Sequence, residues 1–132
     1  MVKRATASPR KPPWVPERQQ VIWINCSPQA GTEMRDLHPF LVLSPRAFNE
    51  RTSLVIGLPM TTEPYNADNP FAVAVGAASG KKTGKTSYVL CHQPKSFDWR
   101  IRQATRHPLK QLDDHRFAEC CARLNQIVQL AG

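Results

Sequence analysis

Apolar and β-branched residues occur in short runs along this chain, separated by turn-forming residues. Five such runs follow residue 20, at 21–24, 40–43, 54–58, 71–75 and 87–91. Runs of this length with Pro, Gly or Asn between them are typical of buried strands in a small barrel or sandwich. The Gly-, Lys- and Thr-rich stretch 76–86 predicts a hairpin-type connection between the last two strands. The pattern therefore predicts a mainly β fold.

The spacing of apolar residues changes near the C-terminus, where they recur at intervals of three and four. The residues with this spacing are Phe117, Cys120, Cys121, Leu124, Ile127 and Val128. This is the apolar stripe of an amphipathic α-helix, predicted over about 113–130, with Asp113 or Asp114 as its N-cap. The stripe assigns Cys120 and Cys121 to core packing and not to redox chemistry.

The first 19 residues have a different composition, with four prolines, five basic residues and almost no apolar periodicity. We expect a basic, proline-rich flexible tail over 1–19, and one folded domain over 20–132 that includes the helix.

The charge of the chain narrows the choice of partners. A formal net charge of +8 favours nucleic acid first and an acidic protein second, although it can also serve solubility alone. No apolar run of about 18 residues and no secretory signal occur, so we expect a cytoplasmic protein without membrane contact. The four cysteines contain no Cys-x-x-Cys pair, and neither a metal nor another cofactor is predicted.

The segment Gly80–Thr86 imitates a phosphate-binding loop, but it does not meet the requirements of one. Only three residues separate its two glycines, and it leads into a predicted strand where the motif must open a helix. His92 follows Cys91 directly, so on a strand the two side chains point to opposite faces and cannot hold one metal ion. Nucleotide and metal sites are therefore not predicted here.

Four segments contain distinctive combinations of residues: PQAGTE at 28–33, HPFLVLSP at 38–45, PMTT at 59–62 and CHQPKSFDWRIR at 91–102. In this order along the chain they resemble the MazF/PemK family of toxin endoribonucleases. The resemblance runs from about residue 20 to the C-terminus. It implies a small SH3-like barrel of the CcdB/PemK toxin type with a C-terminal helix, forming a homodimer. It further implies a partner antitoxin of acidic character and metal-independent cleavage of single-stranded RNA, in which the ribose 2′-hydroxyl attacks the neighbouring phosphate.

The resemblance suggests catalytic roles for His38, Thr61 and His92. Thr61 matches a threonine that holds the phosphate in the family. His38, however, stands where the family has an arginine, and His92 where the PemK branch has an aspartate. The family's arginine two places before that aspartate is here Leu90. The further candidates, for RNA binding, are Glu33, Arg35, Thr62, Lys85, Lys95, Arg100 and Arg102.

Two explanations of these departures remain open. His38 and His92 would form an acid–base pair on one phosphodiester, because one imidazole can be charged while the other is neutral. Alternatively, the lost arginine leaves a weakened or inactive family member that acts as an RNA- or protein-binding module, an antitoxin binder or a CcdB-like topoisomerase poison.

Aromatic residues need a separate assignment, because they can stack on bases or fill a core. We expect Trp23, Phe40 and Phe71 to lie in the core, since they fall in predicted strands. Phe97 and Trp99 lie beside basic residues and could contact RNA, but packing is favoured.

Overall fold

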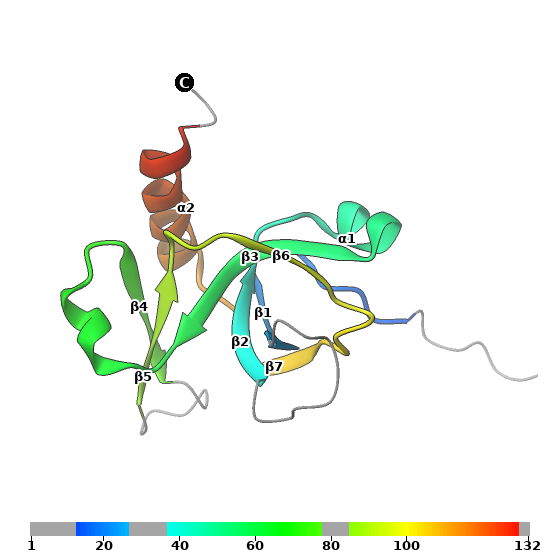
Figure 1. Ribbon diagram of the computed structural model, residues 1–132, viewed down its shortest axis with the longest axis horizontal. Coiled ribbons are helices and arrows are strands. Elements are labelled where there is room, and N and C mark those ends of the chain that lie inside the picture. The colour runs from blue at the N-terminus through cyan, green and yellow to red at the C-terminus, as the bar shows by residue number, and fades with distance from the viewer. Residues whose placement is uncertain (1–12, 27–36, 78–84, 130–132) are drawn as a thin grey trace, which may run out of the picture.

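The computed structural model of this 132-residue chain describes residues 13–26, 37–77 and 85–129. Within these residues, seven strands form one curled antiparallel sheet, and an α-helix follows at the C-terminus (Figure 1). The elements in chain order are β1 (Gln20–Asn25), β2 (Leu37–Val42), α1 (Arg46–Thr52), β3 (Leu54–Thr61), the 3-10 helix η2 (Pro64–Asp68), β4 (Ala72–Ala77), β5 (Thr86–Leu90), β6 (Lys95–Asp98), β7 (Thr105–Gln111) and α2 (Asp114–Val128). No helix of the described part is long and apolar enough to cross a membrane.

The long strand β3 joins β4 and β5 on one side of the sheet to β2, β1 and β7 on the other. The strand order is β4-β5-β3-β2-β1-β7, and β6 also pairs with β3. The first half of β3 pairs with β6, while Met60 and Thr61 at its end pair with β5. Because β3 changes its partner along its length, the sheet curls into a half-barrel. The predicted barrel-type fold with a C-terminal helix is confirmed.

Strands β1 and β2 are buried on both faces, which explains their continuous apolar runs. Val21 and Leu41 face a core that also contains β4, β5 and α2, which we call the helix-side core. Ile22 and Phe40 face a second core that contains Trp99 and Val15. Strands covered on both sides need apolar residues at consecutive positions, so alternation is lost.

Helix α2 begins and ends close to the predicted positions. Asp113 is its N-cap and accepts a hydrogen bond from the Arg116 N–H at 3.0 Å. Phe117 and Cys120 are buried, which confirms the packing role of the first part of the stripe. The last turn differs, because Val128 is 42% exposed and contributes to an open groove.

The N-terminal boundary needs a correction. Within the described residues 13–19, Val15 is 4% exposed and packs in the second core, and Trp14 contacts the Trp99 ring edge-on. This stretch belongs to the folded domain, although its prolines made it resemble a tail. Residues 1–12 lie outside the described part.

The expected core position of Phe71 was also wrong. Phe71 is 40% exposed and precedes β4, which begins at Ala72. Phe40 is fully buried as expected, and Trp23 is half-buried against the His107 ring, with 4.4 Å between ring centroids.

Candidate active site

One edge of the curled sheet gathers the end of β1, the start of β2, the end of β3 and the start of β5. Ile24 pairs with His38, and Thr61 pairs with Tyr88. The β2–β3 ladder ends at the pair Phe40–Pro59, and His38 and Thr61 each lie two residues beyond that end. We call this region the polar edge, and its residues are His38, Thr61, Thr62, Lys85, Thr86, Tyr88 and Arg102.

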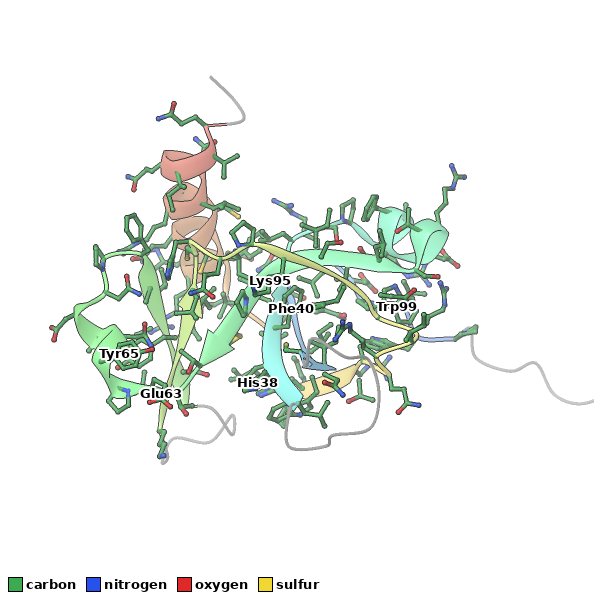
Figure 2. All side chains as sticks on the ribbon, in the orientation of Figure 1. His38, Phe40, Glu63, Tyr65, Lys95 and Trp99 are labelled. Atoms are coloured by element: carbon green, nitrogen blue, oxygen red, sulfur yellow. The ribbon has the colours of Figure 1, made fainter. Side chains whose placement is uncertain are left out.

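His38 and Thr61 also share one face of the sheet. Leu41 and Met60 both point into the helix-side core. Side chains alternate along a strand, so His38 and Thr61 point to the opposite face, away from that core. His38 is exposed. In Figure 2 it lies at the lower end of β2, the same end of the molecule as Glu63, which follows the two threonines.

The two threonines at the end of β3 have different surroundings. The Thr61 hydroxyl oxygen accepts the Glu63 N–H at 3.2 Å, which orients the hydroxyl while leaving its hydrogen for a ligand. Thr62 lines an open pocket of about 220 Å³ together with Pro64 and with the start of β5 at Lys85, Thr86 and Tyr88. The polar edge thus offers hydroxyl groups, an imidazole and an ammonium group, which suit an anionic, hydrogen-bonding ligand.

Arg102 adds a permanent positive charge near His38. Its guanidinium donates to the Asn25 carbonyl at 2.8 Å and lies over the Phe97 ring, 4.8 Å from the centroid. Asn25 ends β1 opposite Leu37, the neighbour of His38. Arg102 is therefore held at the end of β1 that borders His38.

Arg100 has a different role, although it is only two residues away. Its guanidinium donates to the Ser53 hydroxyl and to the Glu50 carbonyl, and stacks over Trp99. Trp99 is buried, and its indole N–H donates to the Asn49 carbonyl at 2.8 Å. These contacts fasten the segment after β6 to α1, and they agree with the expected packing role of Trp99.

The structure does not bring His92 to this site. His92 lies in a turn beyond β5, four residues after Tyr88, and four residues of strand span about 13 Å. Its ring packs against Phe71, with 5.6 Å between centroids. The geometry therefore does not support the hypothesis of two imidazoles converging on one phosphodiester, because His92 lies away from the polar edge.

The other candidates for RNA binding are distributed over the molecule. Lys95 starts β6 and pairs with Gly57, so it lies above His38 in Figure 2, away from the polar edge. Glu33 and Arg35 lie outside the described residues. Thr86 and Tyr88 were not predicted as site residues, and only their position within three residues of Lys85 in the sequence could have indicated them.

The buried titratable groups lie away from the polar edge. The Cys120 thiol hydrogen-bonds to Cys91, which lowers the pKa of Cys91 and raises that of Cys120. Both thiols are fully buried, in agreement with a packing role. Burial lowers the pKa of His107, whose Nδ1 accepts the Leu109 N–H at 3.0 Å.

The fold and the polar edge define a class of protein: a small, mostly β half-barrel with a C-terminal helix and a phosphate-compatible site at one edge of its sheet. The chain belongs to the PemK-like, MazF-like toxin family of type II toxin–antitoxin systems, whose sequence model matches residues 17–128.

Individual relatives agree with this assignment. The chain is 33% identical to the endoribonuclease toxin MazF of Escherichia coli K12 over 93 residues, which are 70% of this chain and 78% of that protein. The crystal structure of MazF from Deinococcus radiodurans matches with a TM-score of 0.72 and 32% identity, covering 89% of this chain and 100% of the other. A MazE–MazF structure from the same organism matches with a TM-score of 0.71 and 28% identity, covering 90% of this chain and 100% of the other.

Proposed function

We propose that this chain is the toxin of a type II toxin–antitoxin pair and acts as a metal-independent endoribonuclease on single-stranded RNA, including mRNA. The observation that supports the proposal is that His38 and Thr61 each lie two residues beyond the end of the β2–β3 ladder, with Arg102 held at the end of β1 that borders β2. MazF of Escherichia coli K12, which is 33% identical to this chain, is an endoribonuclease toxin, and this supports the same reaction class.

The site residues suit an attack by the ribose 2′-hydroxyl on the neighbouring phosphorus. His38 accepts the proton of the 2′-hydroxyl as the 2′-oxygen bonds to phosphorus. The Thr61 hydroxyl and the Arg102 guanidinium donate to the phosphoryl oxygens, on which negative charge accumulates. The bond from phosphorus to the 5′-oxygen then breaks, and that oxygen takes a proton from water. The products are a 2′,3′-cyclic phosphate and a free 5′-hydroxyl.

Histidine in place of arginine changes the chemistry available at this position. Arginine stays protonated, whereas the imidazole of histidine changes its charge between about pH 5 and pH 8. A neutral imidazole at position 38 can accept a proton, which a guanidinium cannot, while Arg102 supplies the permanent charge. This division of roles favours an active enzyme over the weakened binding module considered from the sequence.

The reaction is tested by incubating the purified protein with defined single-stranded RNAs in the presence of EDTA. We expect cleavage with cyclic-phosphate and 5′-hydroxyl ends, identified by mass spectrometry of the fragments. RNA that stays intact over the pH range in which histidine titrates would contradict the proposal and support the binding-module alternative.

An acidic antitoxin is the second partner that we propose. The net charge of +8 gives the toxin a surface that attracts an acidic chain. The MazE–MazF structure of Deinococcus radiodurans shows a family member together with an antitoxin. RNA as substrate, together with the free cysteines, supports a cytoplasmic location.

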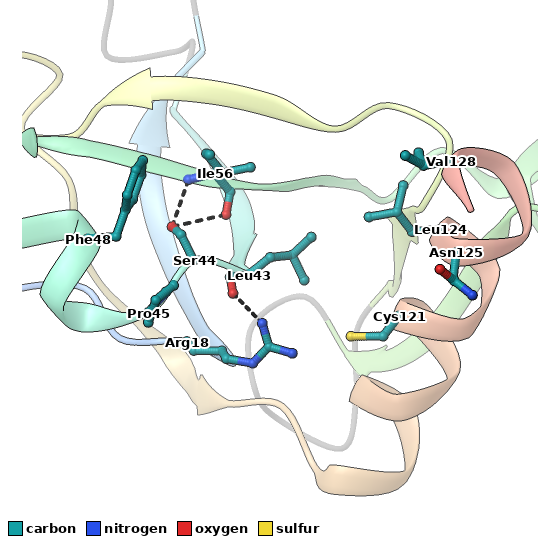
Figure 3. Close-up of a pocket in the computed structure, with 10 residues that line it drawn as sticks. All are labelled: Arg18, Leu43, Ser44, Pro45, Phe48, Ile56, Cys121, Leu124, Asn125 and Val128. Atoms are coloured by element: carbon teal, nitrogen blue, oxygen red, sulfur yellow. Dashed lines mark hydrogen bonds between the residues drawn. The ribbon is translucent and has the colours of Figure 1, made fainter. Parts of the chain in front are cut away.

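A homodimer is the assembly that we propose, formed across the groove between α2 and the sheet (Figure 3). This groove has a volume of about 480 Å³, and apolar side chains form most of its lining. Ile56 on β3 and Val128 on α2 lie on opposite sides of it and are 39% and 42% exposed. Arg18, whose guanidinium donates to the Leu43 carbonyl at 2.6 Å, is its one charged lining residue within the described chain. An open apolar surface of this kind suits a second copy of the same chain.

A further inference from the structure

The outer face of β5 carries an aromatic side chain beside the proposed catalytic threonine. Along β5, Ser87 and Val89 are buried, whereas Thr86 is exposed and Tyr88 half-buried. Tyr88 therefore points to the same outer face as Thr61, its direct partner on β3. Directly opposite residues of an antiparallel pair have Cβ atoms about 4.5–5.5 Å apart. The tyrosine ring thus lies within one side-chain length of the Thr61 hydroxyl.

The neighbours of Tyr88 on both sides are small. Its partner on β3 is Thr61, and its partner on β4 is Ala74. Neither side chain is large enough to cover the face of the tyrosine ring, which is half-buried and borders the same pocket as Pro64 of η2. The part of the ring that lines this pocket is a platform on which a flat ligand can stack, next to the position proposed for the scissile phosphate.

The pocket beside this ring is rich in hydrogen-bond donors. Tyr88 lines it together with Thr62, Pro64, Lys85 and Thr86. Lysine can only donate hydrogen bonds, while the threonine hydroxyls can donate or accept. No carboxylate lines the pocket, so the described lining favours a ligand edge that presents acceptors.

We propose that Tyr88 and Lys85 form a base-binding subsite that takes one unpaired RNA base with a keto oxygen at C4 of a pyrimidine or C6 of a purine, uracil or guanine, adjacent to the phosphodiester at Thr61. The base stacks on Tyr88, and the Lys85 ammonium donates to the keto oxygen. Cytosine and adenine present an amino group at the equivalent position, which cannot accept from lysine. This inference rests on the proposed function, because it places the base of the same RNA substrate.

The test measures binding without cleavage. Four tetranucleotides that are 2′-O-methylated throughout, and hence unable to attack the phosphate, differ in a single base beside the central phosphate. A second set of four varies the base on the other side. Fluorescence anisotropy with the full chain gives the dissociation constant of each. In one of the two sets we expect uracil and guanine to bind about tenfold more tightly than cytosine and adenine, the effect of one hydrogen bond to a charged group.

Variants separate stacking from hydrogen bonding. Tyr88→Ala is expected to weaken binding of the uracil and guanine oligonucleotides about 5- to 150-fold, as for loss of one base–aromatic stack, while Tyr88→Phe retains affinity. Lys85→Met is expected to abolish the preference for keto bases. Phe71→Ala is the matched control, because it removes an exposed aromatic ring at the other end of the same small sheet. It should leave both affinity and preference unchanged.

Equal binding of the four bases in both sets would overturn the subsite, as would a Tyr88→Ala variant with unchanged affinity and preference. Cleavage of the all-ribose versions of the same oligonucleotides is measured separately. Base preference that depends on Tyr88 without any cleavage would support the subsite and contradict the nuclease proposal. Cleavage without any effect of Tyr88→Ala or Lys85→Met on base preference would support the nuclease proposal and contradict the subsite.

Discussion

Gly57 occupies a position in β3 that no residue with a side chain can take without moving the sheet. A Cβ atom built there would lie 2.0 Å from the Leu41 carbonyl oxygen and 2.7 Å from Cε2 of Phe40. Overpacking a core costs about 1–3 kcal/mol when side chains can adjust. Here the nearest obstacle is the backbone of the paired strand β2, which cannot rotate away. We therefore expect Gly57→Ala to lower the free energy of unfolding by about 3 kcal/mol or more.

Gly76→Ala provides the matched control. Gly76 has a φ of +110°, but a Cβ atom there would meet nothing within 4 Å. Its substitution costs only the backbone strain of a positive φ, about 1–2 kcal/mol. In thermal unfolding at about 4 °C per kcal/mol, the Gly57 variant should lose at least about 12 °C in Tm and the Gly76 variant about 4–8 °C. A Gly57→Ala protein as stable as the Gly76 variant would refute the argument that β2 and β3 approach too closely for a side chain.

Two further predictions concern pH dependence and assembly. Burial lowers the pKa of His107 from its ordinary value of 6.5. On acidification, therefore, the unfolded chain binds a proton at this histidine before the folded chain does. The free energy of unfolding decreases as the pH drops through about 6.5, and it levels off once the pH is below the folded-state pKa. His107→Asn, which keeps an acceptor for the Leu109 N–H, should lose less stability than the unchanged protein between pH 7.5 and pH 5.5 in urea unfolding; an equal loss would contradict this. Ile56→Glu should shift the molar mass in sedimentation from dimer to monomer, while Ile101→Glu, at an isoleucine 64% exposed outside the groove, should not. A dimer that survives the first change would show that the groove is not its interface.

The elements that could be predicted from the sequence are those whose pattern of apolar residues follows directly from the faces that they bury. The runs 21–24 and 40–43 are apolar throughout because both faces of β1 and β2 are covered, and the stripe of α2 follows its single buried face. Strand β7 gave no such signal. It is an edge strand, with Pro108 and exposed basic residues on either side of the buried His107, and an edge strand tolerates proline because only one of its sides is paired.

The candidate site was predictable only in part, because it depends on strand register. His38 and Thr61 were identified through the family resemblance, and in the structure each lies two residues beyond the end of the β2–β3 ladder. Alternation along a strand indicates only that Tyr88 and its neighbour Val89 point to opposite faces. It could not show that Thr61 pairs with Tyr88, four residues from His92, since a shift in register changes every cross-strand neighbour.

The separation of His38 from His92 makes the catalytic proposal directly testable. The measurement is the cleavage rate of one single-stranded RNA by His38→Ala and His92→Ala, each with its folding verified by circular dichroism. We expect His38→Ala to be about 100- to 1000-fold slower, as for loss of a general base, and His92→Ala to retain the rate of the unchanged protein. An equal loss in both variants, or an undiminished rate for His38→Ala, would contradict a catalytic site built on His38 and Thr61.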